Sequence, residues 1–111
     1  MNVHMLSERE VRIVDSVHSI DECLMMDIDQ SKDATLVLLV RLKGKEYYSV
    51  VSATGSVVKE FRQFNTLYSF IRKNCSNYLK RQIQNELPVL SMRVSTSEMV
   101  LNSEDEVDVV I

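Results

Sequence analysis

The sequence predicts a single α+β domain, and three observations lead to this fold class. Between residues 35 and 61, assigning alternate residues to opposite faces, as in paired strands, collects apolar residues on one face, and two glycines stand where turns would join those strands. Apolar residues then recur at three- and four-residue spacing between residues 67 and 83, as on one face of a helix. We therefore expect an antiparallel meander of three or four strands, packed on one face by a C-terminal amphipathic helix.

Composition supports one globular domain. The 111 residues are 45% apolar and 26% charged, which is ordinary for such a domain and sufficient for one core. The longest apolar run, Leu36 to Val40, is too short to cross a bilayer, and the first residues lack the apolar stretch of a secretory signal. We expect a cytoplasmic protein without membrane contact, with its domain over residues 1–94 and an acidic, loosely ordered tail over residues 95–111.

The first element is predicted from Ser7-Glu8-Arg9-Glu10, which fits a helix capping box. An N-terminal helix would then run from about Glu8 to His18. Its inward stripe would consist of Val11, Val14 and Val17. A strand remains the alternative, because this segment is rich in β-branched residues, which are at best neutral in helices.

The segment that follows has two alternatives. Ser19-Ile20-Asp21-Glu22 repeats the capping pattern, whereas Cys23 to Asp29 would open the sheet as its first, edge strand. Met25 and Met26 would either fill the core or form an adaptable binding patch, and core filling is favoured.

A hairpin is predicted around Gly44-Lys45, which suits a two-residue type II′ turn. This turn places Lys43 opposite Glu46 and Leu38 opposite Val51. One face would then be almost entirely apolar, with Leu36, Leu38, Val40, Leu42, Tyr47 and Val51. The other face would be half exposed to water, with Val37, Leu39, Arg41, Lys43, Glu46, Tyr48 and Val50.

A second turn at Ala53-Thr54-Gly55 returns the chain as a third strand from Ser56 to Phe61. In this register Val57 and Phe61 join the apolar face. The wet face would gain Glu60, beside Tyr48 and Arg41. The two turns agree on one core face, and a slip of one residue would reverse every side chain.

The main helix is predicted to follow Asn65 as its N-cap and to end before Pro88. Its apolar stripe would cover the apolar face of the sheet and consist of Leu67, Phe70, Ile71, Cys75, Tyr78, Leu79 and Ile83. Asn74-Cys75-Ser76-Asn77 contains weak helix formers and can divide it into two shorter helices. Val89 to Val94 would add a short strand.

The sequence contains no catalytic, metal-binding or cofactor-binding pattern. His4 and His18 are the only histidines, and no neighbouring serine, cysteine or carboxylate completes a triad or metal site around them. Cys23 and Cys75 lack metal-ligand spacing and are expected to be buried free thiols. Both glycines are used by turns, so no phosphate-binding loop remains. We predict a protein that is not an enzyme and needs no cofactor.

Charge is sorted into three blocks along the chain. Residues 1–35 carry eight acidic and three basic residues, residues 36–93 carry three acidic and ten basic, and residues 94–111 carry five acidic and no basic residues. The basic block attracts anions only if the acidic ends do not reach it first. The basic residues of this block either form a solvated surface or bind a nucleic acid or another anionic partner. The candidate residues for such binding are Arg62, Arg72, Lys73, Lys80 and Arg81.

Residues 47–72 contain a strand, a turn glycine, a strand that ends in an aromatic-basic pair, and a short helix that ends near an arginine. These features are Val50-Val51, Gly55, Phe61-Arg62 and Phe70-Ile71-Arg72. The arrangement resembles small accessory proteins of bacterial plasmids and integrative elements. The resemblance implies an accessory or regulatory protein of a mobile element and brings no catalytic residues, while the acidic ends are not part of the pattern.

These observations favour a small non-enzymatic interaction or regulatory protein that binds another protein or itself. The sorted charge lets the acidic ends of one chain pair with the basic middle of another, which predicts a homo-oligomer. The alternative is a nucleic-acid-binding accessory protein whose acidic tail competes for the basic surface.

Overall fold

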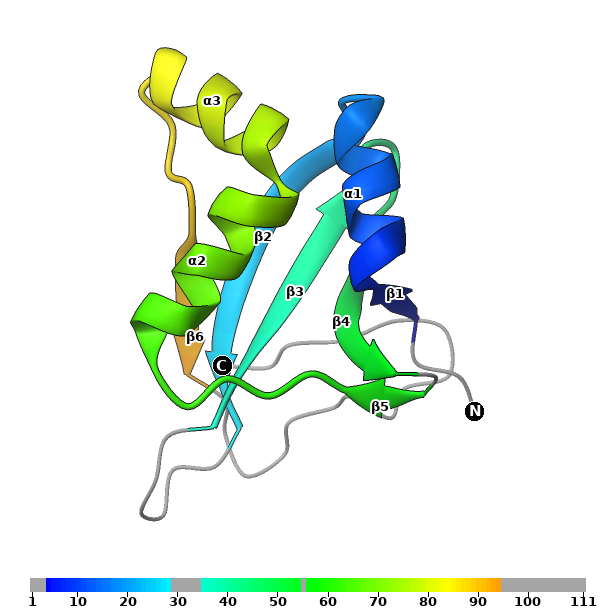
Figure 1. Ribbon diagram of the computed structural model, residues 1–111. Coiled ribbons are helices and arrows are strands. Elements are labelled where there is room, and N and C mark those ends of the chain that lie inside the picture. Colours follow the sequence, from blue (N-terminus) through cyan, green and yellow to red (C-terminus); the bar gives the residue numbers. More distant parts are fainter. Residues whose placement is uncertain (1–3, 29–34, 55, 95–111) are drawn as a thin grey trace.

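The computed structural model describes residues 4–28, 35–54 and 56–94 (Figure 1). In chain order the elements are β1 (Met5–Ser7), α1 (Glu8–Ser16), β2 (Ile20–Asp27), β3 (Leu36–Leu42), β4 (Tyr48–Thr54), β5 (Val57–Val58), α2 (Phe64–Asn74), α3 (Ser76–Gln84) and β6 (Ser91–Val94). The α+β class predicted from the sequence is confirmed. The predicted acidic tail, residues 95–111, lies outside the described residues.

The described strands form one mixed sheet in the order β1-β4-β3-β2-β6, with β5 paired to β4. Strand β3 is antiparallel to β2 and β4, whereas β1 is parallel to β4 and β6 is parallel to β2. The prediction of a purely antiparallel meander is therefore wrong. Helical connections through α1 and through α2 and α3 carry the chain back across the sheet, and such crossovers produce parallel strands.

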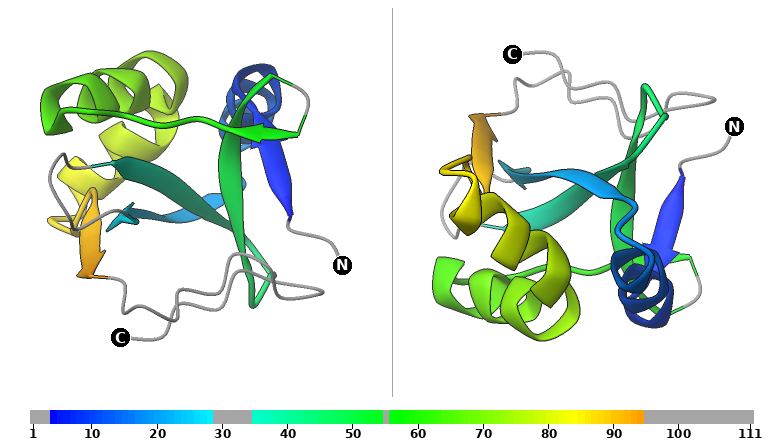
Figure 2. Two further views of the ribbon diagram at one scale, coloured as in Figure 1. Left: turned by 90° about the horizontal axis from the view of Figure 1, so that it is seen from below. Right: turned by 90° about the horizontal axis from the view of Figure 1, so that it is seen from above.

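All three helices lie on one face of the sheet (Figures 1 and 2). Between them and the sheet lies the main core, in which Leu38, Val51 and Phe61 pack in one cluster with Leu67 and Ile71. The predicted apolar face and its helical cover are thus confirmed. Burial of such side chains stabilises a fold by about 1.5 to 3 kcal/mol each before entropy is counted.

Helix α1 begins as predicted. The Ser7 hydroxyl accepts the Glu10 N–H at 3.1 Å, and the Glu10 carboxylate accepts the Ser7 N–H at 2.8 Å, so the capping box is formed. The helix ends at Ser16 rather than His18, and His18 adopts a positive φ of 57°. Because the helix stops before Val17, that side chain is 64% exposed, and its predicted inward orientation is wrong.

The segment after α1 is a strand, so Ser19 to Glu22 does not cap a helix. Strand β2 lies between β3 and β6 and is not the predicted edge strand. Its position follows from β6, a parallel neighbour that the local pattern of β2 does not reveal. Met25 and Met26 are buried, which confirms core filling over a methionine binding patch.

The hairpin of β3 and β4 has the predicted register. Leu39 pairs with Val50 and Arg41 with Tyr48, as expected from the pairing of Leu38 with Val51. The turn differs from the expected type II′, because the Leu42 carbonyl accepts the Lys45 N–H at 3.0 Å and closes the turn one residue earlier. Glycine is still required, since Gly44 has a φ of +82° in the third position of this turn.

The second face of the sheet is half wet, as predicted: Lys43 and Glu46 are exposed, whereas Val37, Leu39 and Val50 are buried. A second cluster of fully buried side chains lies there, made of Leu24, Met26, Val37, Leu39 and Val50. Pairing of β2 with β3 sets Leu24 beside Leu39 and Met26 beside Val37. The hairpin supplies three of these side chains, and β2 adds Leu24 and Met26, whose register could not be read from the hairpin.

The predicted strand from Ser56 to Phe61 forms only in part. Strand β5 spans two residues, and Val57 is 60% exposed, so its predicted place on the apolar face is wrong. Phe61 instead reaches β3, where it exchanges two backbone hydrogen bonds of 2.8 Å with Leu36. The chain has left β4 at this point and crosses toward the helices.

The C-terminal helical segment is divided into α2 and α3 at Cys75, which confirms the shorter-helix alternative. The Asn74 side chain donates to the Phe70 carbonyl at 3.0 Å and accepts from Arg12 at 2.9 Å, which ties the end of α2 to α1. Two details of the prediction are wrong. The N-cap is Gln63 rather than Asn65, and Ile83 is 60% exposed because the break rotates α3 relative to α2.

Candidate functional site

A polar cleft of about 330 Å³ lies beside the first half of β2. Strand β6 pairs with β2 only from Leu24 onward, so no described strand pairs with the preceding residues of β2 on this edge. Helix α3 and the loop that follows it run alongside instead. The cleft is lined by Asp21, Glu22, Arg41, Arg81, Gln82, Asn85, Leu87, Pro88 and Ser91.

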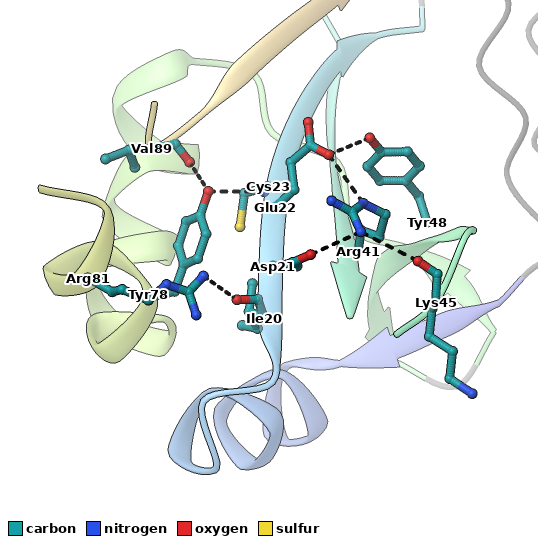
Figure 3. A network of polar contacts seen from close by, with 10 residues as sticks. All are labelled: Ile20, Asp21, Glu22, Cys23, Arg41, Lys45, Tyr48, Tyr78, Arg81 and Val89. Carbon is teal, nitrogen blue, oxygen red and sulfur yellow. Dashed lines mark hydrogen bonds and ion pairs between the residues drawn. The ribbon is translucent and has the colours of Figure 1, made fainter. Parts of the chain in front are cut away.

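Side chains of α3 form hydrogen bonds with the backbone of β2 at the part of its edge where β6 does not pair. The Tyr78 hydroxyl accepts the Cys23 N–H at 3.1 Å and donates to the Val89 carbonyl at 2.6 Å (Figure 3). The Arg81 guanidinium donates to the Ile20 carbonyl at 2.5 Å. The Cys23 N–H and the Ile20 carbonyl thereby obtain hydrogen-bond partners on this edge of the sheet.

Arg41 is the centre of a charged network on the other side of β2 (Figure 3). Its guanidinium lies 3.1 Å from Asp21 and 3.3 Å from Glu22, and Tyr48 donates to the same Glu22 oxygen at 2.6 Å. Burial alone would lower the pKa of Arg41, but the Glu22 hydrogen bond and the Asp21 charge outweigh it and raise that pKa. Burial and the Glu22 contact also raise the pKa of Tyr48.

The chemistry available in this cleft is recognition by hydrogen bonds and ion pairs. Burial raises the pKa of Tyr78, and contact with Cys75 together with burial raises the pKa of Cys23 well above its usual range. Neither group is therefore an activated nucleophile near neutral pH. Within residues 4–28, 35–54 and 56–94, no three His, Cys, Asp or Glu side chains converge as metal ligands.

The five basic residues predicted as a binding site do not share one environment, because Arg81 is half-buried and the other four are exposed. Arg62, Arg72, Lys73 and Lys80 are exposed and make no ion pair with another described residue. Arg81 turns into the cleft instead, as described above.

Sequence reasoning missed Asp21 and Glu22 as partners of Arg41. The expected neighbour of Arg41 was Glu60, which is exposed and makes no such contact. The predicted hairpin register did place Arg41 opposite Tyr48, and this pairing is confirmed. The missing information was the pairing of Glu22 with Arg41 across an irregular step in β2.

Comparison with known proteins found no matching family model, curated protein or solved structure. Among the described residues, no helix combines the length and the apolar character needed to cross a membrane.

Proposed function

We propose that the chain is a small non-enzymatic interaction protein and that it associates with a second copy of itself through the outer edge of β6. The resemblance of residues 47–72 to accessory proteins of mobile elements supports a regulatory role of this kind. Such a protein needs a surface that can bind and does not need a catalytic group.

The edge strand β6 is the observation that carries this proposal. In the described sheet β6 pairs with β2 on one side, and no other described strand pairs with its outer side. Unpaired backbone groups on an edge accept a strand from another chain, and specificity comes from the alternate side chains. Met92 of β6 is 60% exposed, so an apolar contact is available beside the backbone hydrogen bonds.

A second copy fits this edge because two identical strands pair across a twofold axis, which is the commonest symmetry of homo-oligomers. The four residues of β6 provide few backbone bonds, so the association is expected to be weak and to depend on concentration. Backbone pairing and apolar contact persist at high salt, whereas pairing of acidic ends with a basic middle is screened.

The test is light scattering of the full chain over a range of protein and salt concentrations. The wild type should show a dimer, and Met92→Lys should be monomeric, because a charge at an edge strand opposes pairing. Val17→Lys is the matched control, since Val17 is also highly exposed but lies after α1. A wild type that is monomeric at every concentration and salt would contradict the proposal.

Nucleic-acid binding is the second candidate, and the four exposed, unpaired basic side chains favour it. Each phosphate contact contributes about one unit to the slope of log affinity against log salt. The double variant Arg72→Glu with Lys73→Glu should weaken binding to a DNA duplex at low salt and reduce that slope by about two. The control variant, Lys43→Glu with Lys45→Glu, makes the same charge change at the exposed hairpin turn.

Neutralising acidic residues near the C-terminus is a second test of nucleic-acid binding. If they compete for the basic surface, then Glu104→Gln, Asp105→Asn and Glu106→Gln together should raise DNA affinity and steepen its salt dependence. No detectable DNA binding by this triple variant at low salt would dispose of the nucleic-acid candidate.

A further inference from the structure

The guanidinium of Arg81 is held in a fixed position with part of its binding capacity unused. It donates to the Ile20 carbonyl at 2.5 Å and to the Gln82 side chain at 3.4 Å, and it lies 5.5 Å from the centre of the Tyr78 ring. A guanidinium has five N–H donors, and these two hydrogen bonds use one on Nε and one on Nη2. Three donors therefore remain available at the cleft.

The neighbours that hold Arg81 are themselves constrained. The buried Gln82 side chain donates to the Pro88 carbonyl at 2.7 Å while its oxygen accepts from Arg81. The Tyr78 ring is held by its hydroxyl, which accepts from the Cys23 N–H and donates to the Val89 carbonyl. Arg81 is thus preorganised, which lowers the entropic cost of binding a ligand.

Arg81 has no direct counter-ion among the described residues. None of their carboxylates lies within ion-pair distance of its guanidinium. The two carboxylates that line the same cleft, Asp21 and Glu22, are both bound by Arg41. A planar guanidinium with free donors is the preferred receptor for a carboxylate.

The rest of the cleft limits which anion fits. In Figure 3 one oxygen of Glu22 carries both contacts, from Arg41 and Tyr48, while the other oxygen carries none. The lining of the cleft thus contains a free acceptor on Glu22 as well as free donors on Arg81, which favours a ligand that has both a negative charge and N–H groups. The charges of Asp21, Glu22, Arg41 and Arg81 balance, which disfavours a doubly charged phosphate.

We propose that the cleft binds the free C-terminal carboxylate of a peptide, with Arg81 as the carboxylate receptor. The last peptide N–H groups of the ligand donate to the free oxygens of Glu22 and Asp21, and its terminal side chain contacts Leu87 and Pro88. The volume of about 330 Å³ lies at the lower end of the range for ligand pockets. The inference does not depend on pairing at β6, because it concerns the cleft beside β2 and not the outer edge.

The test follows the Arg81 Nε–Hε signal of the full chain by nuclear magnetic resonance. Acetyl-Ala-Ala-Val with a free carboxylate should shift this signal in a saturable way. The same peptide with a C-terminal amide should bind at least about tenfold more weakly, because a charged hydrogen-bonded pair is lost. Acetate and inorganic phosphate should each bind more weakly than the carboxylate peptide.

Two variants complete the experiment. Arg81→Lys keeps the charge but not the planar fork of donors. Its peptide binding, followed by the backbone amide signals of the cleft residues Gln82 and Asn85 in both the variant and the wild type, should weaken about tenfold or more. Arg72→Gln is the control, because Arg72 is exposed on α2 and does not line the cleft. Retained dispersion of the backbone amide signals verifies that each variant is folded.

Three results would overturn the inference. Equal affinity for the carboxylate and amide peptides would show that the cleft does not recognise the carboxylate. Acetate or phosphate binding as tightly as the peptide would identify a small free anion as the ligand. An unchanged affinity of Arg81→Lys for the carboxylate peptide would show that the Arg81 guanidinium is not the carboxylate receptor. None of these results bears on dimer formation through β6, which light scattering measures separately.

Discussion

The carboxylate of Asp15 caps helix α3 by accepting the backbone N–H of Tyr78 at 2.8 Å. Its second oxygen accepts the Asn77 N–H at 3.0 Å, although Asp15 belongs to α1. The residue at the N-cap position of α3, Cys75, makes no side-chain cap. The helix therefore obtains its cap from a distant helix, and the negative charge is also favourable at a helix N-terminus.

Loss of this cap should be costly. Asp15→Ala is expected to lower the free energy of unfolding by about 2 to 3 kcal/mol, because it leaves backbone donors without a charged acceptor in a largely buried place. Ser7→Ala, which removes the exposed cap of α1, should cost about 1 kcal/mol. Urea denaturation followed by circular dichroism measures both. Equal losses in the two variants would show that Asp15 does not act as a buried cap.

The second face of the sheet gives another test. Leu38 and Leu39 are both fully buried, on opposite faces of β3. Leu38→Ala and Leu39→Ala should each lower the free energy of unfolding by about 2 to 5 kcal/mol. Val57→Ala serves as the exposed control and should change it by less than about 0.5 kcal/mol. A nearly neutral Leu39→Ala would contradict the packing of Leu39 in the second cluster.

Leu38 and Leu39 show which contacts in the sheet could be predicted from the sequence and which could not. The register around Gly44 was predictable, because alternation and the turn residue act within one hairpin. Leu39 also packs in one cluster with Leu24, which β2 supplies from outside that hairpin. The uninterrupted apolar run from Leu36 to Val40 was the available signal, since strands buried on both faces have such runs.

The candidate site was less predictable for the same reason. The basic character of residues 62–81 could be read from composition, and four of the five predicted residues are exposed. The inward turn of Arg81 requires the helix break at Cys75 and a carbonyl from β2. Parallel pairing of β1 and β6 also left no local signal, because these strands span only three and four residues.

Alkaline pH should destabilise the fold through Tyr78. Burial raises the pKa of Tyr78 in the folded chain above its usual value of about 10, so the folded state holds a proton that the unfolded state releases. This contribution to stability is fully present below about pH 10 and is lost as the pH rises toward the higher pKa of the folded state. The raised pKa of Cys23 acts in the same direction from about pH 9 upward.

A tyrosine variant isolates this effect. Tyr78→Phe should be less stable at pH 7, because the Cys23 N–H and the Val89 carbonyl lose their partner, but its stability should fall less steeply above pH 10. Tyr68→Phe is the control, because the Tyr68 hydroxyl has no hydrogen-bond partner within the described ranges. Melting temperatures from pH 7 to 11 give the comparison, and parallel curves for wild type and Tyr78→Phe would contradict it.

The two cysteines report on how tightly α2 and α3 pack against β2. Both thiols are free and buried in the main core, and contact with Cys75 and burial raise the pKa of Cys23. Because the thiolate is the reactive form, Ellman's reagent should reach these cysteines only when the structure opens. An opening free energy of about 3 kcal/mol makes the reaction more than about a hundredfold slower in the native protein than in urea.

An engineered exposed cysteine provides a reference rate for the reaction with Ellman's reagent. Lys73→Cys adds a third cysteine on the surface of α2, and this thiol should react at once under native conditions while Cys23 and Cys75 remain protected. The same variant in urea should release three equivalents of the coloured product. If the native wild type reacted as fast as the added thiol, the helix pair would not be packed on β2, and the fixed position of Arg81 at the cleft would lose its support.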